Sequence, residues 1–158
     1  MKRSIFASLS LATVSVTACG APPPKAAAVV AAVGVFTSAP DCAASGLLDT
    51  AGCDVLIQQV IANHQKNAKS YISMRLCEEA EGADRCERAD PKTFRRSLLA
   101  FQVTFSKPPV AIPLYMAKDQ GAVGFSPFDK SKVILAADET IIFSPEAKLV
   151  AQSNVPQK

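Results

Sequence analysis

The chain has 158 residues, of which 17 are Lys or Arg, 14 are Asp or Glu and one is His. The net charge of +3 is too small to indicate a nucleic-acid partner. The length supports one domain with a hydrophobic core.

Residues 1–18 have the features of a secretory signal. Lys2 and Arg3 give a positively charged start, and the apolar run at 5–16 is too short to span a membrane permanently. The following small-residue stretch, Val-Thr-Ala-Cys, is similar to the lipobox of bacterial lipoproteins. Cleavage before Cys19 would make it the mature N-terminus and the site of lipidation, with palmitate or a similar acyl chain as the membrane anchor. The alternative is an ordinary signal peptide with an incidental cysteine.

The residue after the predicted lipidation site indicates in which membrane the protein is anchored. In enteric-type envelopes an Asp at this position favours the inner membrane, so Gly20 favours the outer membrane, with the protein facing the periplasm. Loss of the signal also leaves 15 basic against 14 acidic residues, because it removes Lys2 and Arg3. We therefore expect the membrane, through the lipid anchor on Cys19, and an unidentified envelope partner, and no nucleic acid.

Residues 19–35 are predicted to be the lipidated cysteine and a tether. The run Gly-Ala-Pro-Pro-Pro-Lys at 20–25 cannot form a helix and has little apolar side chain to bury. The apolar segment Ala26 to Phe36 is too short for a second span, and its periodicity does not distinguish a buried strand from a helix. A single globular domain is expected at 36–151, followed by a frayed polar tail at 152–158.

One amphipathic helix is predicted from Asp54 to Tyr71. Its apolar stripe recurs at spacings of three and four residues, and polar side chains occupy the other side. The stripe consists of Ile57, Val60, Ile61, His64, Ala68 and Tyr71. Because His64 lies on this stripe, we expect it to pack in the core and to do no chemistry.

Four cysteines remain once Cys19 carries lipid: Cys42, Cys53, Cys77 and Cys86. An even set in an oxidising compartment predicts two disulfides, and the spacings within each half are too wide for structural zinc. The intervening helix makes a bond between Cys53 and Cys77 difficult, because its 18 residues span about 27 Å. Short loops favour Cys42 with Cys53 and Cys77 with Cys86, while crossed pairs remain feasible.

Charged residues crowd the segment around Gly82, and we expect them to be solvated. The acids Glu78, Glu79 and Glu81 are predicted to lie on an exposed turn between the third and fourth cysteines. A basic stretch follows, diluted by acids, which could face phospholipid headgroups but which we expect to be ordinary surface. It consists of Arg85, Arg88, Lys92, Arg95 and Arg96.

The second half of the chain has the pattern of strands. Apolar and polar residues alternate from Phe101 to Phe105, Ala111 to Met116 forms another candidate, and Val133 to Ala137 with Thr140 to Phe143 resembles a hairpin. The expected architecture is α+β, with one main helix between disulfide-stapled loops, packed on a small antiparallel sheet.

No set of residues for catalysis or cofactor binding can be recognised. One histidine and no Gly-x-Ser-x-Gly motif argue against a hydrolase, and no phosphate-binding loop is present. Asp41, Asp49 and Asp54 lack the ligand pattern of a calcium loop. We therefore predict no catalytic residue, no cofactor and no metal site.

The spacing of several residues resembles the bacterial family catalogued as domain of unknown function 1190. They are Asp41, Cys42, Cys53, Tyr71, Cys77, Gly82 and Cys86, and the run at 113–115 resembles a later Pro-Leu-aromatic element of that family. The resemblance implies an envelope lipoprotein of unassigned molecular function and supplies no catalytic residue.

Two kinds of function remain open. The leading hypothesis is a non-enzymatic binding or structural protein, and the alternative is an enzyme of unrecognised type acting on an envelope component. A pocket that gathers His64 with an acid and a hydroxyl would favour the enzyme. An exposed apolar groove beside the strands would favour a binding module.

Overall fold

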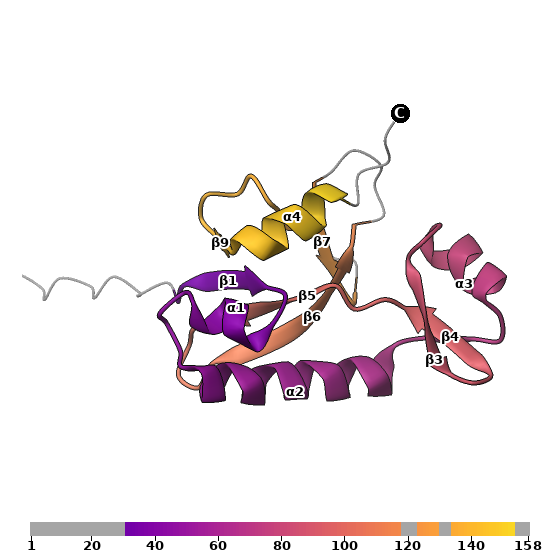
Figure 1. The fold of residues 1–158 in the computed structure, drawn as a ribbon, viewed down its shortest axis with the longest axis horizontal. Helices are drawn as coiled ribbons and strands as arrows, with labels where there is room; N and C mark the ends of the chain where they lie inside the picture. The colour runs from indigo at the N-terminus through magenta and orange to yellow at the C-terminus, as the bar shows by residue number, and fades with distance from the viewer. Residues whose placement is uncertain (1–30, 118–122, 130–133, 154–158) are drawn as a thin grey trace, which may run out of the picture.

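The computed structural model describes residues 31–117, 123–129 and 134–153, and it has the predicted α+β class (Figure 1). In chain order the elements are β1 (Val33–Phe36), α1 (Ala39–Ala43), α2 (Thr50–Asn67), β2 (Ser70–Tyr71), α3 (Met74–Glu81), β3 (Cys86–Asp90), β4 (Thr93–Arg96), β5 (Ala100–Thr104), β6 (Val110–Met116), β7 (Gly124–Pro127), β8 (Ile134–Leu135), β9 (Ile142–Phe143) and α4 (Pro145–Ser153). Within the described residues, no helix has both the length and the apolar character needed to cross a membrane.

A six-stranded sheet with the order β8-β7-β6-β5-β1-β9 forms the centre of the fold. All its pairs are antiparallel except β1 with β9, which is parallel. Helices cover both faces, with α4 on one side and α1 and α2 on the other (Figure 1). Successive residues of β1 serve the two faces: Val35 packs in the core beneath α4, and Phe36 packs in the core beneath α1 and α2.

A second, smaller sheet lies beyond the C-terminal end of α2 (Figure 1). Its three strands have the order β2-β4-β3, and α3 packs against β3 and β4. The two sheets are connected by the short segment between β4 and β5, so the side chains at the end of β4 lie next to the large sheet.

The main helix, α2, exists as predicted but is shifted by four residues. Asp49 caps its N-terminus by accepting a hydrogen bond from the Gly52 amide, so the helix begins at Thr50 and not at Asp54. It ends at Asn67, because Tyr71 is extended and pairs with Phe94 of β4. Its buried face consists of Cys53, Leu56, Val60 and His64.

The predicted hairpin between residues 133–137 and 140–143 is wrong. Residue 133 lies outside the described residues, and Ile134–Leu135 pairs with β7 at one edge of the large sheet. Ile142–Phe143 pairs with β1 at the opposite edge. The parallel pairing with β1 gives β9 a partner that neighbours it in space but not in sequence.

The folded region also extends beyond the boundaries expected from the sequence. β1 begins at Val33, inside the range 19–35 assigned to the tether. The apolar segment that ends at Phe36 therefore contains a strand and not a helix in its described part. Helix α4 continues to Ser153, inside the range 152–158 assigned to the tail. Cys19 and residues 154–158 lie outside the described residues.

Gly124 at the start of β7 has no room for a side chain. A Cβ there would overlap the backbone carbonyl of Ile134 on the neighbouring strand, which cannot rotate away. We expect Gly124→Ala to lower the free energy of unfolding by about 2 to 3 kcal/mol. Urea unfolding followed by circular dichroism measures this.

Gly46→Ala provides the control for that experiment. Gly46 has a φ of +72°, and no atom lies within 4 Å of an added Cβ. The substitution should therefore lower the free energy of unfolding only through backbone strain, by about 1 kcal/mol. Equal losses at Gly46 and Gly124 would contradict the predicted clash.

Candidate functional site: a polar junction between the two sheets

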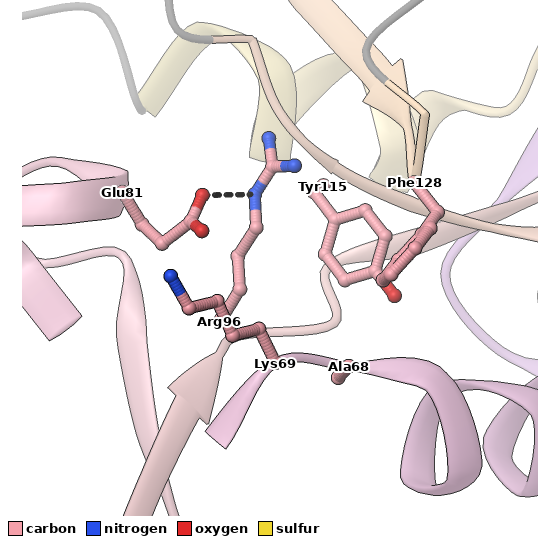
Figure 2. A pocket seen from close by; sticks show the side chains of 6 residues that line it. All are labelled: Ala68, Lys69, Glu81, Arg96, Tyr115 and Phe128. Carbon is pink, nitrogen blue, oxygen red and sulfur yellow. Dashed lines mark ion pairs between the residues drawn. The ribbon is translucent and has the colours of Figure 1, made fainter. Parts of the chain in front are cut away.

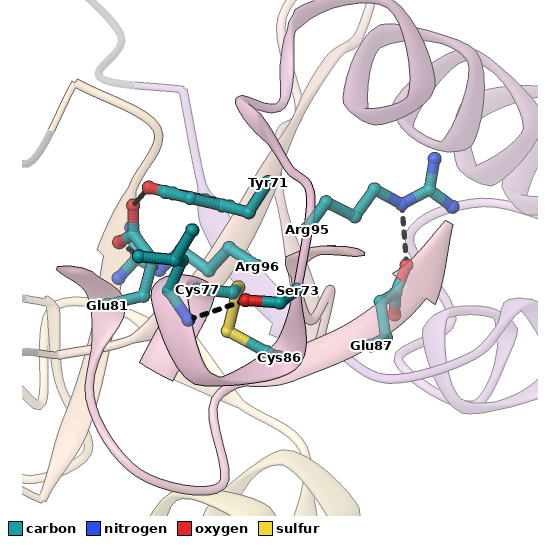
Figure 3. Close-up of a disulfide and its surroundings, with 9 residues drawn as sticks. Tyr71, Ser73, Cys77, Glu81, Cys86, Glu87, Arg95 and Arg96 are labelled. Carbon is teal, nitrogen blue, oxygen red and sulfur yellow. Dashed lines mark hydrogen bonds and ion pairs between the residues drawn. A yellow bond between two sulfur atoms is a disulfide. The ribbon is translucent and has the colours of Figure 1, made fainter. Parts of the chain in front are cut away.

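Both predicted disulfides are present. Cys42 forms a disulfide with Cys53 that joins α1 to α2, and Cys77 forms one with Cys86 that joins α3 to β3. This is the pairing through short loops that the sequence favours. The first lies in the core under the large sheet. The second holds α3 against the small sheet, next to a group of buried polar side chains (Figure 3).

Arg96 is the centre of this group and links the two sheets. It is the last residue of β4, it is 7% exposed, and its Nη2 donates to the Met116 carbonyl oxygen on β6 and to Ser126 Oγ on β7, the latter at 2.9 Å. Its guanidinium carbon lies 4.6 Å from the centroid of the Tyr115 ring. Its Nε is buried, has no hydrogen-bond partner and lies 3.8 Å from Glu81 Oε2.

Glu81 is buried as well, which corrects the expectation that the acids around Gly82 are all solvated. Residues 74–81 form a helix instead of an open turn, and the last turn points Glu81 inward while Glu79 stays exposed. Glu81 Oε1 accepts a 2.7 Å hydrogen bond from the Tyr71 hydroxyl (Figure 3). Burial and this bond raise the pKa of Tyr71 to about 12, so the phenol stays protonated at neutral pH.

The family-motif residue Gly82 ends this helix. It has a φ of +110°, a conformation that favours glycine, and it lets the chain turn from α3 toward Cys86. Asp41, the first residue of the same motif, accepts hydrogen bonds from the Thr37 amide and from the Ser144 hydroxyl. Both motif residues therefore have clear structural roles.

His64 is buried, as its place on the apolar stripe predicts, and both of its nitrogens have partners. Nδ1 lies 2.9 Å from the Tyr115 hydroxyl, and Nε2 lies 3.2 Å from Glu87 Oε1, which also accepts from Arg95. A carboxylate only accepts, so Nε2 carries the proton and Nδ1 accepts from Tyr115. Burial lowers the pKa of His64 below 6.5, against the opposing bond to Glu87.

The trio of His64, Glu87 and Tyr115 has the residue types of an acid–base site, but its histidine and its tyrosine are enclosed and Glu87 alone is partly exposed. His64 is 2% exposed and Tyr115 is fully buried. Burial raises the pKa of Tyr115 to about 12, so its hydroxyl is a hydrogen-bond donor and not a nucleophile. The trio joins α2, the small sheet and the large sheet, which is a structural role.

A cavity of about 200 Å³ opens beside this cluster (Figure 2). We call it the junction cavity, and it is lined by Ala68, Lys69, Glu81, Arg96, Tyr115 and Phe128. It lies where the end of α2, the end of α3 and the strands of both sheets meet. Its wall combines three charged side chains with two aromatic rings.

A larger depression of about 470 Å³ adjoins the cavity. We call it the apolar groove, and it is lined by Asn63, Asn67, Ile112, Pro113, Pro127, Phe128 and Asp129. Phe128 is shared by both spaces, and Asn67 of the groove precedes Ala68 of the cavity on α2. The two spaces are therefore neighbours, and Phe128 lies in the wall of both.

The basic stretch from Arg85 to Arg96 is only partly solvated, contrary to the expectation. Arg95 pairs with Glu87 at 2.8 Å and is half-buried, and Arg96 is enclosed in the junction. Arg88 and Lys92 are exposed, in agreement with the sequence. Strand alternation explains the difference, because it places neighbouring arginines on opposite faces of β4.

Sequence reasoning missed the junction residues Arg96, Glu81 and Phe128. One signal was available: Phe94, Arg96 and Leu98 fall on one side of an extended segment, and both flanking residues are apolar. No comparable signal exists for Phe128, which reaches the junction only through the pairing of β6 with β7.

Comparison with known proteins gives one match. A family model described as "Protein of unknown function (DUF1190)" matches residues 31–127. The match starts just before β1 and stops at the last residue of β7, so β8, β9 and α4 lie beyond it. No curated protein and no solved structure matches the chain.

Proposed function

We propose that this chain, which belongs to the DUF1190 family of proteins of unknown function, is an exported, lipid-anchored envelope protein that binds a partner and catalyses no reaction. The signal features of residues 1–18 and the cysteine at position 19 support export and anchoring, with the outer membrane as the address and the domain facing the periplasm.

The apolar groove is the observation that carries the binding function. It lies beside strands β6 and β7 and includes Phe128, which is 47% exposed although it is a large aromatic residue. Exposed aromatic residues in a concave apolar surface are typical of binding sites. The trio around His64 supports the same choice, because both ring nitrogens of the buried His64 already have hydrogen-bond partners in Tyr115 and Glu87.

A photocrosslinking experiment tests binding at the groove. A benzophenone amino acid replaces Asn67, which lines the groove. In a matched variant it replaces Gln65, which is also exposed on the last turns of α2 but does not line the groove. Irradiation of intact cells should give discrete higher-mass adducts from position 67 and not from position 65. Equal adduct patterns at both positions, or none at either, would contradict a partner in this groove.

A further inference from the structure

The junction cavity has an excess of positive charge. Among the described residues that line it, Lys69 and Arg96 are cationic and Glu81 is the one acid. The Glu81 carboxylate already accepts from Tyr71, and its distance of 3.8 Å from Arg96 Nε is beyond hydrogen-bond length. One carboxylate balances the charge of one cation, so the described lining has a net positive charge that favours an anionic ligand group.

The positions of the two cations assign them different roles. Lys69 is exposed at the mouth of the cavity, with Nζ 5.0 Å from the centroid of the Tyr71 ring, so its ammonium group can contact a ligand directly. Arg96 lies in the wall of the cavity (Figure 2). Its bonds to the large sheet fix it there, so it supplies charge without moving. A carboxylate fits this arrangement, since it is small and singly charged.

The rest of the surface indicates what is attached to that carboxylate. The ring centroids of Tyr115 and Phe128 lie 6.3 Å apart, and the two rings give the cavity an aromatic wall. Phe128 also lines the apolar groove. A ligand with its anionic end beside Lys69 would thus place apolar atoms on Phe128 and extend along the groove.

Two carboxamides on the groove favour a peptide over a plain acyl chain. Asn67 Nδ2 donates to Asn63 Oδ1 at 2.7 Å, which leaves the Asn63 amide as a donor and the Asn67 carbonyl as an acceptor. An extended peptide offers an acceptor and a donor for these two remaining groups, whereas a hydrocarbon chain offers neither.

We infer that the junction cavity and the apolar groove together bind the C-terminal end of a polypeptide, with its terminal carboxylate beside Lys69 and its apolar last side chain against Phe128. This inference rests on the proposed binding function and adds the chemical class of the partner.

The test uses affinity selection with mass-spectrometric readout. The mature chain carrying Cys19→Ala is immobilised with its disulfides formed and incubated with N-acetyl tetrapeptides of mixed sequence, supplied as equimolar free acids and C-terminal amides. Acids ending in an apolar residue should be enriched about tenfold over their amides, because one charge-assisted hydrogen bond is at stake. Lys69→Gln should abolish that preference, and Lys66→Gln, which removes another exposed charge outside the lining, should preserve it.

Three results would overturn the inference: acids and amides retained equally by the wild-type domain, an unchanged preference in Lys69→Gln, or displacement of all selected acids by decanoate at lower concentration than by the peptides. Each of these leaves the crosslinking at position 67 free to succeed. Crosslinks with no acid preference would therefore reject the C-terminal ligand and retain a groove-binding partner.

Discussion

Arg96→Met should lower the free energy of unfolding by about 3 to 5 kcal/mol, which is the usual cost of removing one member of a buried ion pair. Methionine keeps most of the stem but loses the hydrogen bonds to Met116 and Ser126. It also leaves the Glu81 carboxylate, which is 9% exposed, without the guanidinium charge that faces it. Urea unfolding of the disulfide-intact domain measures the loss.

A second substitution tests whether the uncompensated charge is the cause. Glu81→Gln removes that charge, so the double variant Arg96→Met with Glu81→Gln should be more stable than Arg96→Met alone by at least about 1 kcal/mol. Arg75→Met is the control, because the Arg75–Glu79 pair is exposed on α3 and is worth less than about 1 kcal/mol. Simple additivity of the two junction substitutions would show that the pair is not coupled.

Cys19→Ala should transfer the protein completely from the membrane fraction to the soluble periplasmic fraction. Each buried methylene of an acyl chain contributes about 0.8 kcal/mol, so the two or three chains expected on this cysteine hold the protein far more tightly than any surface contact. Immunoblotting of carbonate-washed membranes measures the location of the protein. Labelling with an alkyne analogue of palmitate measures its lipidation.

Other cysteines provide the matched control for the anchor. The double variant Cys77→Ala with Cys86→Ala removes a disulfide but should keep both the label and the membrane location. Gly20→Asp should move the protein from the outer to the inner membrane on a sucrose gradient. Retention of the palmitate label in Cys19→Ala would reject the proposed anchor.

The parts of the fold that could be predicted are those encoded by local patterns. The three- and four-residue spacing around Val60 and His64 identified α2, and the alternation from Phe101 to Val103 identified β5. The ends of α2 were misplaced because they depend on the Asp49 cap and on the pairing of Tyr71 with β4. A cap is a local signal that can be weighed in advance, but strand pairing is not.

The parts that could not be predicted depend on contacts between distant segments. Glu81 and Glu79 are chemically identical and two residues apart, and only the docking of α3 on the small sheet buries the first. Helix α4 was missed although Ala147 and Ala151 lie one turn apart on its buried face, because alanine contrasts weakly with its neighbours. The candidate site combines both difficulties, since its residues come from elements far apart in the chain, among them α2, α3, β4 and β6.

The position of β1 sets the order in which this fold can be completed. β1 lies between β5 and β9, so the first strand of the domain has both of its neighbours later in the chain, the second of them more than a hundred residues away. A chain emerging N-terminus first therefore cannot finish its central sheet until β9 is available, and closing such long loops is slow. The hydrogen bond from Ser144 to Asp41 forms in the same late step. Until β9 is available, the emerging polypeptide therefore stays incompletely folded. Translocation through a membrane channel requires an unfolded chain, so late completion of the sheet suits a protein that we propose is exported.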